Sequence, residues 1–182
     1  MLESLGVVTT LVRRPSELAA IDGIVLPGGE STTIDKLLRA FGVFEPLRAR
    51  LHAGMPALGT CAGMILLADA IVGGTAEQQT LGGLPVTVRR NAFGRQVDSA
   101  EVTLTWLPDG TPMHATFIRA PWVEEVGAGV EVLATEGAHG GRVVAVRHGN
   151  IVATAFHPEI SGEARVHEYF VDIVRTAVSA QG

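Results

Sequence analysis

The sequence has little of what would place it in several common protein classes. One cysteine among 182 residues excludes an internal disulfide and fits a reducing compartment, so we expect a cytoplasmic protein. Its 14 Lys and Arg residues form no long basic run and the net charge is −5, so we expect no nucleic-acid partner. No apolar run approaches the roughly 20 residues that a transmembrane helix needs, so we expect no membrane partner.

What the sequence does have is typical of one compact domain. Hydrophobic residues make up 47% and charged residues 18%, with 22 glycines. These proportions favour a well-buried globular protein and argue against disorder. Because 182 residues suit one domain with a sizeable core better than two, we expect a single domain over residues 1–182.

The order of apolar runs predicts an α/β fold. In the first half, short apolar strands alternate with helices, which favours a parallel sheet covered on both faces. After Gly73-Gly74 the pattern changes to strands joined by short turns, and the chain closes on an amphipathic helix. We expect strands at Val7–Val12, Gly23–Leu26, Pro56–Thr60, Val86–Arg90, Ala100–Trp106, Ala115–Arg119, Glu131–Thr135, Val143–Arg147 and Ile151–Phe156, and helices at Pro15–Ala20, after the capping residues Ser31–Thr33, and at Phe44–Ala53, Ala62–Ala70 and Glu163–Val178.

The single cysteine stands in Gly59-Thr60-Cys61-Ala62-Gly63, where an apolar strand turns directly into a helix. This is the arrangement of a nucleophile elbow with cysteine in place of serine, because small flanking residues permit the strained turn that exposes a nucleophile. The positive end of the helix dipole also favours a thiolate. On these five residues alone, a catalytic cysteine and a buried structural cysteine are equally good interpretations.

His157 and Glu159 follow the predicted strand Ile151–Phe156. If the extended backbone continues, both side chains point the same way, and the carboxylate can orient the imidazole as a general base. The pair alone is also typical of an ordinary loop, but together with the cysteine elbow it indicates a triad of Cys61, His157 and Glu159. The remaining histidines show no metal-ligand spacing, so we expect no metal: His52, His114, His139, His148 and His167.

Two further segments could contact a substrate. In Pro27-Gly28-Gly29-Glu30-Ser31, a glycine turn enters a helix, and its backbone N–H groups could bind an anion or an oxyanion. A phosphate-binding loop is a weaker interpretation, because the lysine of that motif is absent. The basic segment Arg89–Gln96 is either a solvated loop or a place where arginine recognises a carboxylate.

These segments together resemble the class I (triad) glutamine amidotransferases. A narrower resemblance, to the glutaminase subunit of the pyridoxal 5′-phosphate synthase complex, covers essentially the whole chain and rests on four ordered motifs: Leu26–Thr33, Arg90–Gln96, Phe117–Pro121 and Ala155–Glu159. The resemblance implies a three-layer, flavodoxin-like α/β fold. It also implies a mostly parallel central sheet flanked by helices, with additional antiparallel strands.

The same resemblance implies a reaction. Cys61 would attack the side-chain amide of L-glutamine while His157 moves the proton, and the backbone N–H groups of Gly29 and Ala62 would stabilise the oxyanion. Ammonia would pass to a synthase subunit that builds pyridoxal phosphate (vitamin B6) from a pentose phosphate and a triose phosphate, within a large hetero-oligomer. The implied glutaminase needs no cofactor. The residues implied to contact L-glutamine are Gly29, Glu30, Ser31, Arg90, Ile118 and Arg119.

The N-terminus departs from the family pattern. In the family, a strand, a loop with a Gln-Gly pair and most of a helix precede the position at which this sequence starts. We therefore expect a longer native protein to be the active enzyme and this chain to be less stable or impaired. Two other functions stay open at this point: a different cysteine-dependent hydrolase of the same broad fold, and a non-catalytic subunit that binds a partner.

Overall fold

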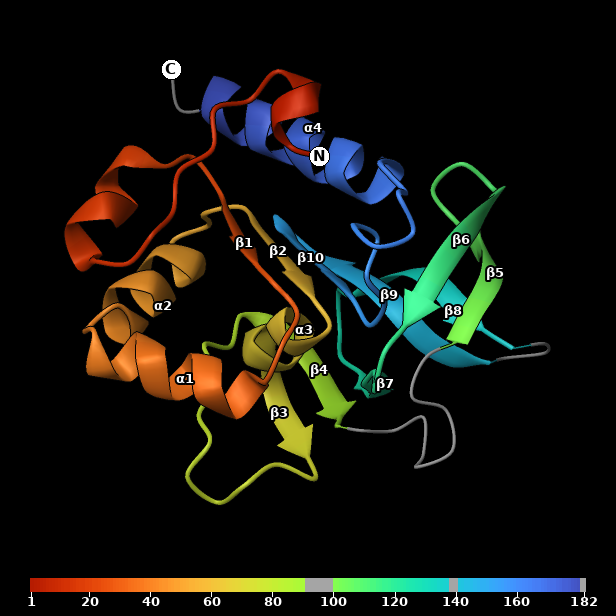
Figure 1. Ribbon diagram of the computed structural model, residues 1–182, viewed down its shortest axis with the longest axis horizontal. Coiled ribbons are helices and arrows are strands. Elements are labelled where there is room, and N and C mark those ends of the chain that lie inside the picture. The colour runs from red at the N-terminus through yellow and green to blue at the C-terminus, as the bar shows by residue number, and fades with distance from the viewer. Residues whose placement is uncertain (91–99, 138–140, 181–182) are drawn as a thin grey trace.

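The protein is described by a computed structural model that covers residues 1–90, 100–137 and 141–180. Its strands form two sheets (Figure 1). The larger sheet has the order β1-β2-β10-β9-β7-β4-β3, with β8 paired to β9, and β5 and β6 form a separate hairpin. The strands are β1 (Ile24–Leu26), β2 (Ala57–Thr60), β3 (Ala68–Val72), β4 (Leu84–Arg89), β5 (Ala100–Trp106), β6 (Thr111–Phe117), β7 (Trp122–Val126), β8 (Glu131–Glu136), β9 (Arg142–His148) and β10 (Ile151–Thr154).

Helices cover the parallel part of the larger sheet. Figure 1 shows α4 along one side of β1, β2 and β10, whereas α3, with α1 packed against it, lies on the other side. None of the helices among the described residues combines the length and the apolar character needed to cross a bilayer. The helices are the 3₁₀ helices η1 (Glu3–Leu5) and η2 (Pro15–Ala20), and α1 (Ser31–Ala40), α2 (Phe44–His52), α3 (Ala62–Leu67) and α4 (Arg165–Ser179).

The predicted α/β fold with helices on a central sheet is confirmed, but the sheet is mixed rather than mostly parallel. Parallel pairing joins β1 to β2, β2 to β10, and β3 to β4. Antiparallel pairing joins β10 to β9, β9 to β7 and β8, and β7 to β4. Antiparallel strands were expected beside the central sheet, but β9 and β7 lie in the middle of that sheet.

Two predicted elements differ from the observed ones, because strand pairing determines which segments form strands. Val7–Val12 forms no strand, since it pairs with no described strand, and Val8 is fully exposed. The helix predicted over Ala62–Ala70 ends at Leu67, because Ala68–Val72 leaves the helix to pair with β4. The strand β7 (Trp122–Val126) was not predicted, and it pairs with β4 and β9.

The start of α1 also differs from the prediction. Its N-cap is Glu30 rather than Ser31–Thr33, since a Glu30 carboxylate oxygen accepts a hydrogen bond from the backbone N–H of Thr32 at 3.2 Å. A capping side chain in this position satisfies one of the free N–H groups of the first turn. The consequence is that the Glu30 side chain lies at the helix N-terminus, beside the residues of the glycine turn.

The core fixes the edge of the sheet at which the site lies. Strands β2 and β10 and the whole of α3 are buried. Because β1, β2 and β10 are parallel, their carboxyl ends meet at one edge of the sheet. Gly29, Cys61 and His157 each follow one of these ends. Residues predicted from three distant segments are therefore brought to one place by the sheet topology.

We expect the buried strand β2 to carry a large share of the stability. Leu58 is fully buried in this strand, whereas Leu37 is half exposed on α1. Leu58→Ala should lower the free energy of unfolding by about 2–5 kcal/mol, because it removes buried methyl groups and leaves a cavity. Leu37→Ala is the matched control and should cost less than about 1 kcal/mol. Equal losses in urea unfolding would contradict this placement of the core.

Candidate active site

Cys61 lies in a sharp, strained turn between β2 and α3. Its φ is 50° and its ψ is −101°, a backbone conformation that residues other than glycine rarely adopt. The turn is held by a hydrogen bond of 2.7 Å from the Cys61 N–H to the carbonyl of Thr154 in β10. Such strain persists only where the surrounding structure enforces it, and it is concentrated at functional sites. The predicted elbow is therefore present in the backbone.

The two glycines of the elbow are required by close approach. A Cβ atom at Gly63 would lie 2.1 Å from the carbonyl oxygen of Leu26 in β1. A Cβ at Gly59 would lie 2.6 Å from the carbonyl carbon of Gly63. These distances are far below van der Waals contact, so only glycine lets α3 pack directly on β1 and β2. The motif Gly59–Gly63 is thus explained by packing around the cysteine.

His157 is buried beside the elbow and hydrogen-bonded to Glu159. The imidazole Nδ1 lies 2.8 Å from a Glu159 carboxylate oxygen. The backbone N–H of His157 donates to the carbonyl of Thr116 at 2.9 Å, which fixes the residue against β6. Gly28 packs on the ring so closely that a Cβ there would lie 2.2 Å from the imidazole Cε1. Backbone and glycine packing therefore hold the ring in one place.

The electrostatic surroundings favour the charged form of His157. Interaction with the Cys61 side chain, followed by the hydrogen bond to Glu159, raises the pKa of His157 to about 9, although burial acts in the opposite direction. The ordinary value for histidine is about 6.5. The imidazolium is therefore the favoured state at neutral pH, facing a sulfur atom on one side and a carboxylate on the other.

Glu159 is set up as an anion. Burial acts to raise the pKa of Glu159, but the hydrogen bonds from His157 and from a backbone N–H, with the nearby charges of His157 and His167, lower it overall. The carboxylate therefore remains ionised and can hold the Nδ1–H of His157. This arrangement leaves the other ring nitrogen free for proton transfer.

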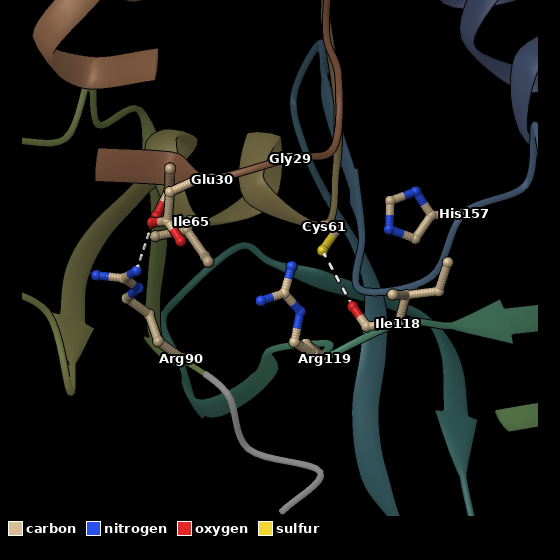
Figure 2. Close-up of a pocket in the computed structure, with 9 residues that line it drawn as sticks. Gly29, Glu30, Cys61, Ile65, Arg90, Ile118, Arg119 and His157 are labelled. Atoms are coloured by element: carbon tan, nitrogen blue, oxygen red, sulfur yellow. Dashed lines mark hydrogen bonds and ion pairs between the residues drawn. The ribbon is translucent and has the colours of Figure 1, made fainter. Parts of the chain in front are cut away.

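The predicted nucleophile and the predicted substrate contacts line one cavity of about 150 Å³ (Figure 2). In Figure 2 the Cys61 sulfur lies between the His157 ring and the Arg119 side chain, 3.9 Å from the carbonyl oxygen of Ile118. Glu159 contacts the His157 ring without lining the cavity, and Ala62 is the buried first residue of α3. The residues that line the cavity are Gly29, Glu30, Ser31, Cys61, Ile65, Arg90, Ile118, Arg119 and His157.

The cavity carries charges of both signs. The Arg90 guanidinium donates a hydrogen bond of 2.8 Å to Glu30, and the side chain of Arg90 is largely buried. No hydrogen bond or ion pair joins the Arg119 side chain to another described residue, and its φ of 44° turns the backbone sharply at the rim. The pKa of Glu30 is lowered by hydrogen bonding to Thr32 and by the charges of Arg90 and Arg119, against burial. Arg90, Arg119 and Glu30 together therefore give the cavity a net positive charge of one.

Sequence reasoning missed two contributors to this cavity. Ile65 lines it and stands four residues after Cys61 on α3, so the helical repeat was a usable signal. Gln78, in the segment after β3, contacts Ser31 and Arg90, and no pattern in the sequence signals this. Of the basic segment Arg89–Gln96, residues 91–96 lie outside the described residues. In the described part of the chain, no three His, Cys, Asp or Glu side chains are grouped to hold a metal ion.

The pKa of His157 gives a direct test of the site electrostatics. Cys61→Ala should lower it from about 9 towards the ordinary value, because the larger stabilising interaction is removed, and Glu159→Gln should lower it by a smaller amount. The folded state raises this pKa, so the stability it contributes is present below about pH 6.5 and is lost as the pH rises towards 9. NMR titration of the His157 ring measures the value. An unchanged pKa in both variants would contradict the described geometry.

Comparison with known proteins identifies the family. The model of the SNO glutamine amidotransferase family matches residues 1–176. Among curated relatives named pyridoxal 5′-phosphate synthase subunit PdxT, the protein of Nocardioides sp. is 60% identical over 96% of this chain and 88% of the relative. The one from Acidothermus cellulolyticus is 62% identical over 90% of this chain and 80% of the relative.

A solved structure gives the same result for the fold. The crystal structure of a glutamine amidotransferase matches with a TM-score of 0.87 and 44% sequence identity, over 95% of this chain and 89% of that chain. The family model, the curated relatives and this structure agree over nearly the full length. This chain therefore belongs to the SNO glutamine amidotransferase family.

Proposed function

We propose that this protein is the glutaminase subunit of a pyridoxal 5′-phosphate synthase, which hydrolyses L-glutamine to L-glutamate and ammonia. The observation that carries the proposal is the geometry of three side chains. Cys61 sits on a strained elbow, and it interacts with a buried His157 that is held by Glu159 at 2.8 Å. Family membership and the relatives named PdxT support the same function.

The first half of the reaction forms a thioester. The Cys61 thiolate attacks the carboxamide carbon of the glutamine side chain, and the negative charge moves to the amide oxygen. Backbone N–H groups at Gly29 and Ala62 are proposed to stabilise this oxyanion, since Ala62 is the first residue of α3 and its N–H is free of helical bonding. The C–N bond then breaks, and the His157 imidazolium gives its proton to the departing nitrogen, so that ammonia leaves.

The second half returns the enzyme to its starting state. The neutral His157 takes a proton from a water molecule, whose oxygen attacks the γ-glutamyl thioester carbon. The C–S bond breaks, the new carboxyl group releases its proton to solvent as glutamate leaves, and the proton on His157 again faces the thiolate. Glu159 remains ionised throughout and stabilises the imidazolium, because its own pKa is lowered in this position.

Charges around the cavity support an amino acid as the substrate. Glutamine carries an α-carboxylate and an α-ammonium group. Arg119 is proposed to bind the carboxylate, since no hydrogen bond or ion pair joins its guanidinium to another described residue. Glu30, held ionised at the cavity rim, is proposed to bind the ammonium group. Ser31, Arg90 and the backbone at Gly29 and Ile118 complete the proposed contacts.

The proposed partner is the synthase subunit that consumes the ammonia. Ammonia released into water is protonated at neutral pH and stops being a nucleophile, so a glutaminase needs its acceptor close by. We propose a hetero-oligomer of this chain with that subunit, consistent with relatives that are named as one subunit of the synthase. We also propose a cytoplasmic location, because the catalytic thiol must stay reduced.

Cys61→Ala should abolish ammonia release from glutamine when assayed together with the synthase subunit. The loss follows because no other described side chain in the cavity can form the thioester. The variant should still bind the synthase subunit in a pull-down, which separates a loss of chemistry from a loss of assembly. Ammonia release at the wild-type rate by Cys61→Ala would show that the nucleophile is wrongly assigned.

Arg119→Met should raise the KM for glutamine at least about tenfold, since a charge-assisted hydrogen bond to the carboxylate is lost. The matched control is Arg89→Met. Arg89 lies one residue before Arg90 and pairs with Glu124 away from the cavity. Steady-state ammonia release measures both variants. The assignment of Arg119 fails if the two variants have the same KM.

A further inference from the structure

Gln78 lies outside the cavity lining and forms hydrogen bonds with two side chains that line it, Ser31 and Arg90. The Gln78 side-chain oxygen accepts a hydrogen bond of 2.7 Å from Arg90, and its nitrogen donates one of 2.9 Å to the hydroxyl of Ser31. Arg90 in turn donates to Glu30 at 2.8 Å. The result is a continuous chain from Ser31 through Gln78 and Arg90 to Glu30.

The chemistry of these groups suits a side chain with both a donor and an acceptor. A guanidinium only donates, so the oxygen of Gln78 must face Arg90. Its amide nitrogen is then left for Ser31, whose buried hydroxyl needs a partner. An amide makes both contacts at once, whereas an ammonium or an apolar group makes only one of them or neither.

The segment that carries Gln78 is itself fixed on both sides. The backbone N–H of Gln79 donates to the buried carboxylate of Asp35 at 3.2 Å, and Asp35 is held by Arg39. Two residues further on, the N–H of Leu81 donates to the carbonyl of Leu66 at 2.7 Å. Gln78 is therefore presented to Arg90 by a segment anchored on α1 and α3, independently of any ligand.

We propose that Gln78 is a positioning residue for substrate binding: it holds Arg90 and Ser31 in the arrangement that receives the amino-acid end of glutamine. This inference rests on the proposed glutaminase function. Gln78 does not line the cavity, so it acts through its two partners. It joins residues that follow two different strands, because Ser31 comes after β1 and Arg90 after β4. Without Gln78, the described contacts hold the Arg90 side chain only through the half-exposed Glu30.

The test compares two neighbouring glutamines in the complex with the synthase subunit. Gln78→Met keeps the length of the side chain and removes both hydrogen bonds. It should raise the KM for glutamine about tenfold, the effect of one lost hydrogen bond to a charged group, while kcat stays within about twofold. Gln79→Met is the matched control, since the Gln79 side chain is exposed and its backbone bond to Asp35 is kept. It should have the wild-type KM.

A double-mutant cycle shows whether the effect passes through Arg90. In the background of Arg90→Met, adding Gln78→Met should raise KM by less than about threefold, because the shared interaction is already lost. Full multiplication of the two effects would overturn the proposal, and so would a KM within twofold of wild type for Gln78→Met alone. If the methionine variant has a lowered melting temperature, Gln78→Asn gives the same test, since its shorter side chain cannot span both partners.

The outcome for the wild-type complex separates this inference from the function on which it rests. A wild-type complex that releases no ammonia from glutamine overturns the proposed glutaminase. A wild-type complex that does release ammonia, together with an unchanged KM in Gln78→Met, overturns only the role of Gln78.

Discussion

The direct packing of α3 on β1 and β2 is the constraint on which the rest of the site depends. Gly59 and Gly63 let the helix approach so closely that the chain must turn through Cys61 with a φ of 50°. Strain of this kind costs about 1–3 kcal/mol, and the full burial of α3 offsets it. The same packing aims the cysteine out of the sheet edge. The positions of the cavity, the proposed nucleophile and the N-terminus of α3 thus depend on glycine at positions 59 and 63.

Two parallel strands beside β2 bring His157 and the glycine turn to this elbow. β10 ends beside β2 and delivers His157, whose pKa of about 9 reflects first the sulfur and then Glu159. β1 ends on the other side and delivers the glycine turn with Glu30. Arg90 follows β4 of the same sheet, and Arg119 lies in the link between β6 of the separate hairpin and β7. The proposed catalytic and binding groups therefore come from different parts of the mixed sheet and from the link to the hairpin.

The parts of the site that depend on local geometry could be predicted from the sequence. The elbow needs only residues 59–63, and the pairing of His157 with Glu159 needs only a spacing of two. Gln78 could not be predicted, because its partner Ser31 is 47 residues away and nothing nearby signals the contact. Strand pairing is equally long-range. Local composition indicated a strand at Val7–Val12, but this segment pairs with no described strand and forms none. Local composition did not indicate a strand at β7, but β7 is one because it pairs with β4.

In the proposed reaction, Cys61 attacks the side chain of glutamine inside this cavity. The most direct test of this step is reaction with an electrophilic glutamine analogue, followed by peptide mapping by mass spectrometry. We expect one adduct, on the peptide that holds Cys61, which forms in parallel with the loss of ammonia release and is slowed by L-glutamine. Inactivation without modification of Cys61, or modification that L-glutamine does not slow, would contradict it.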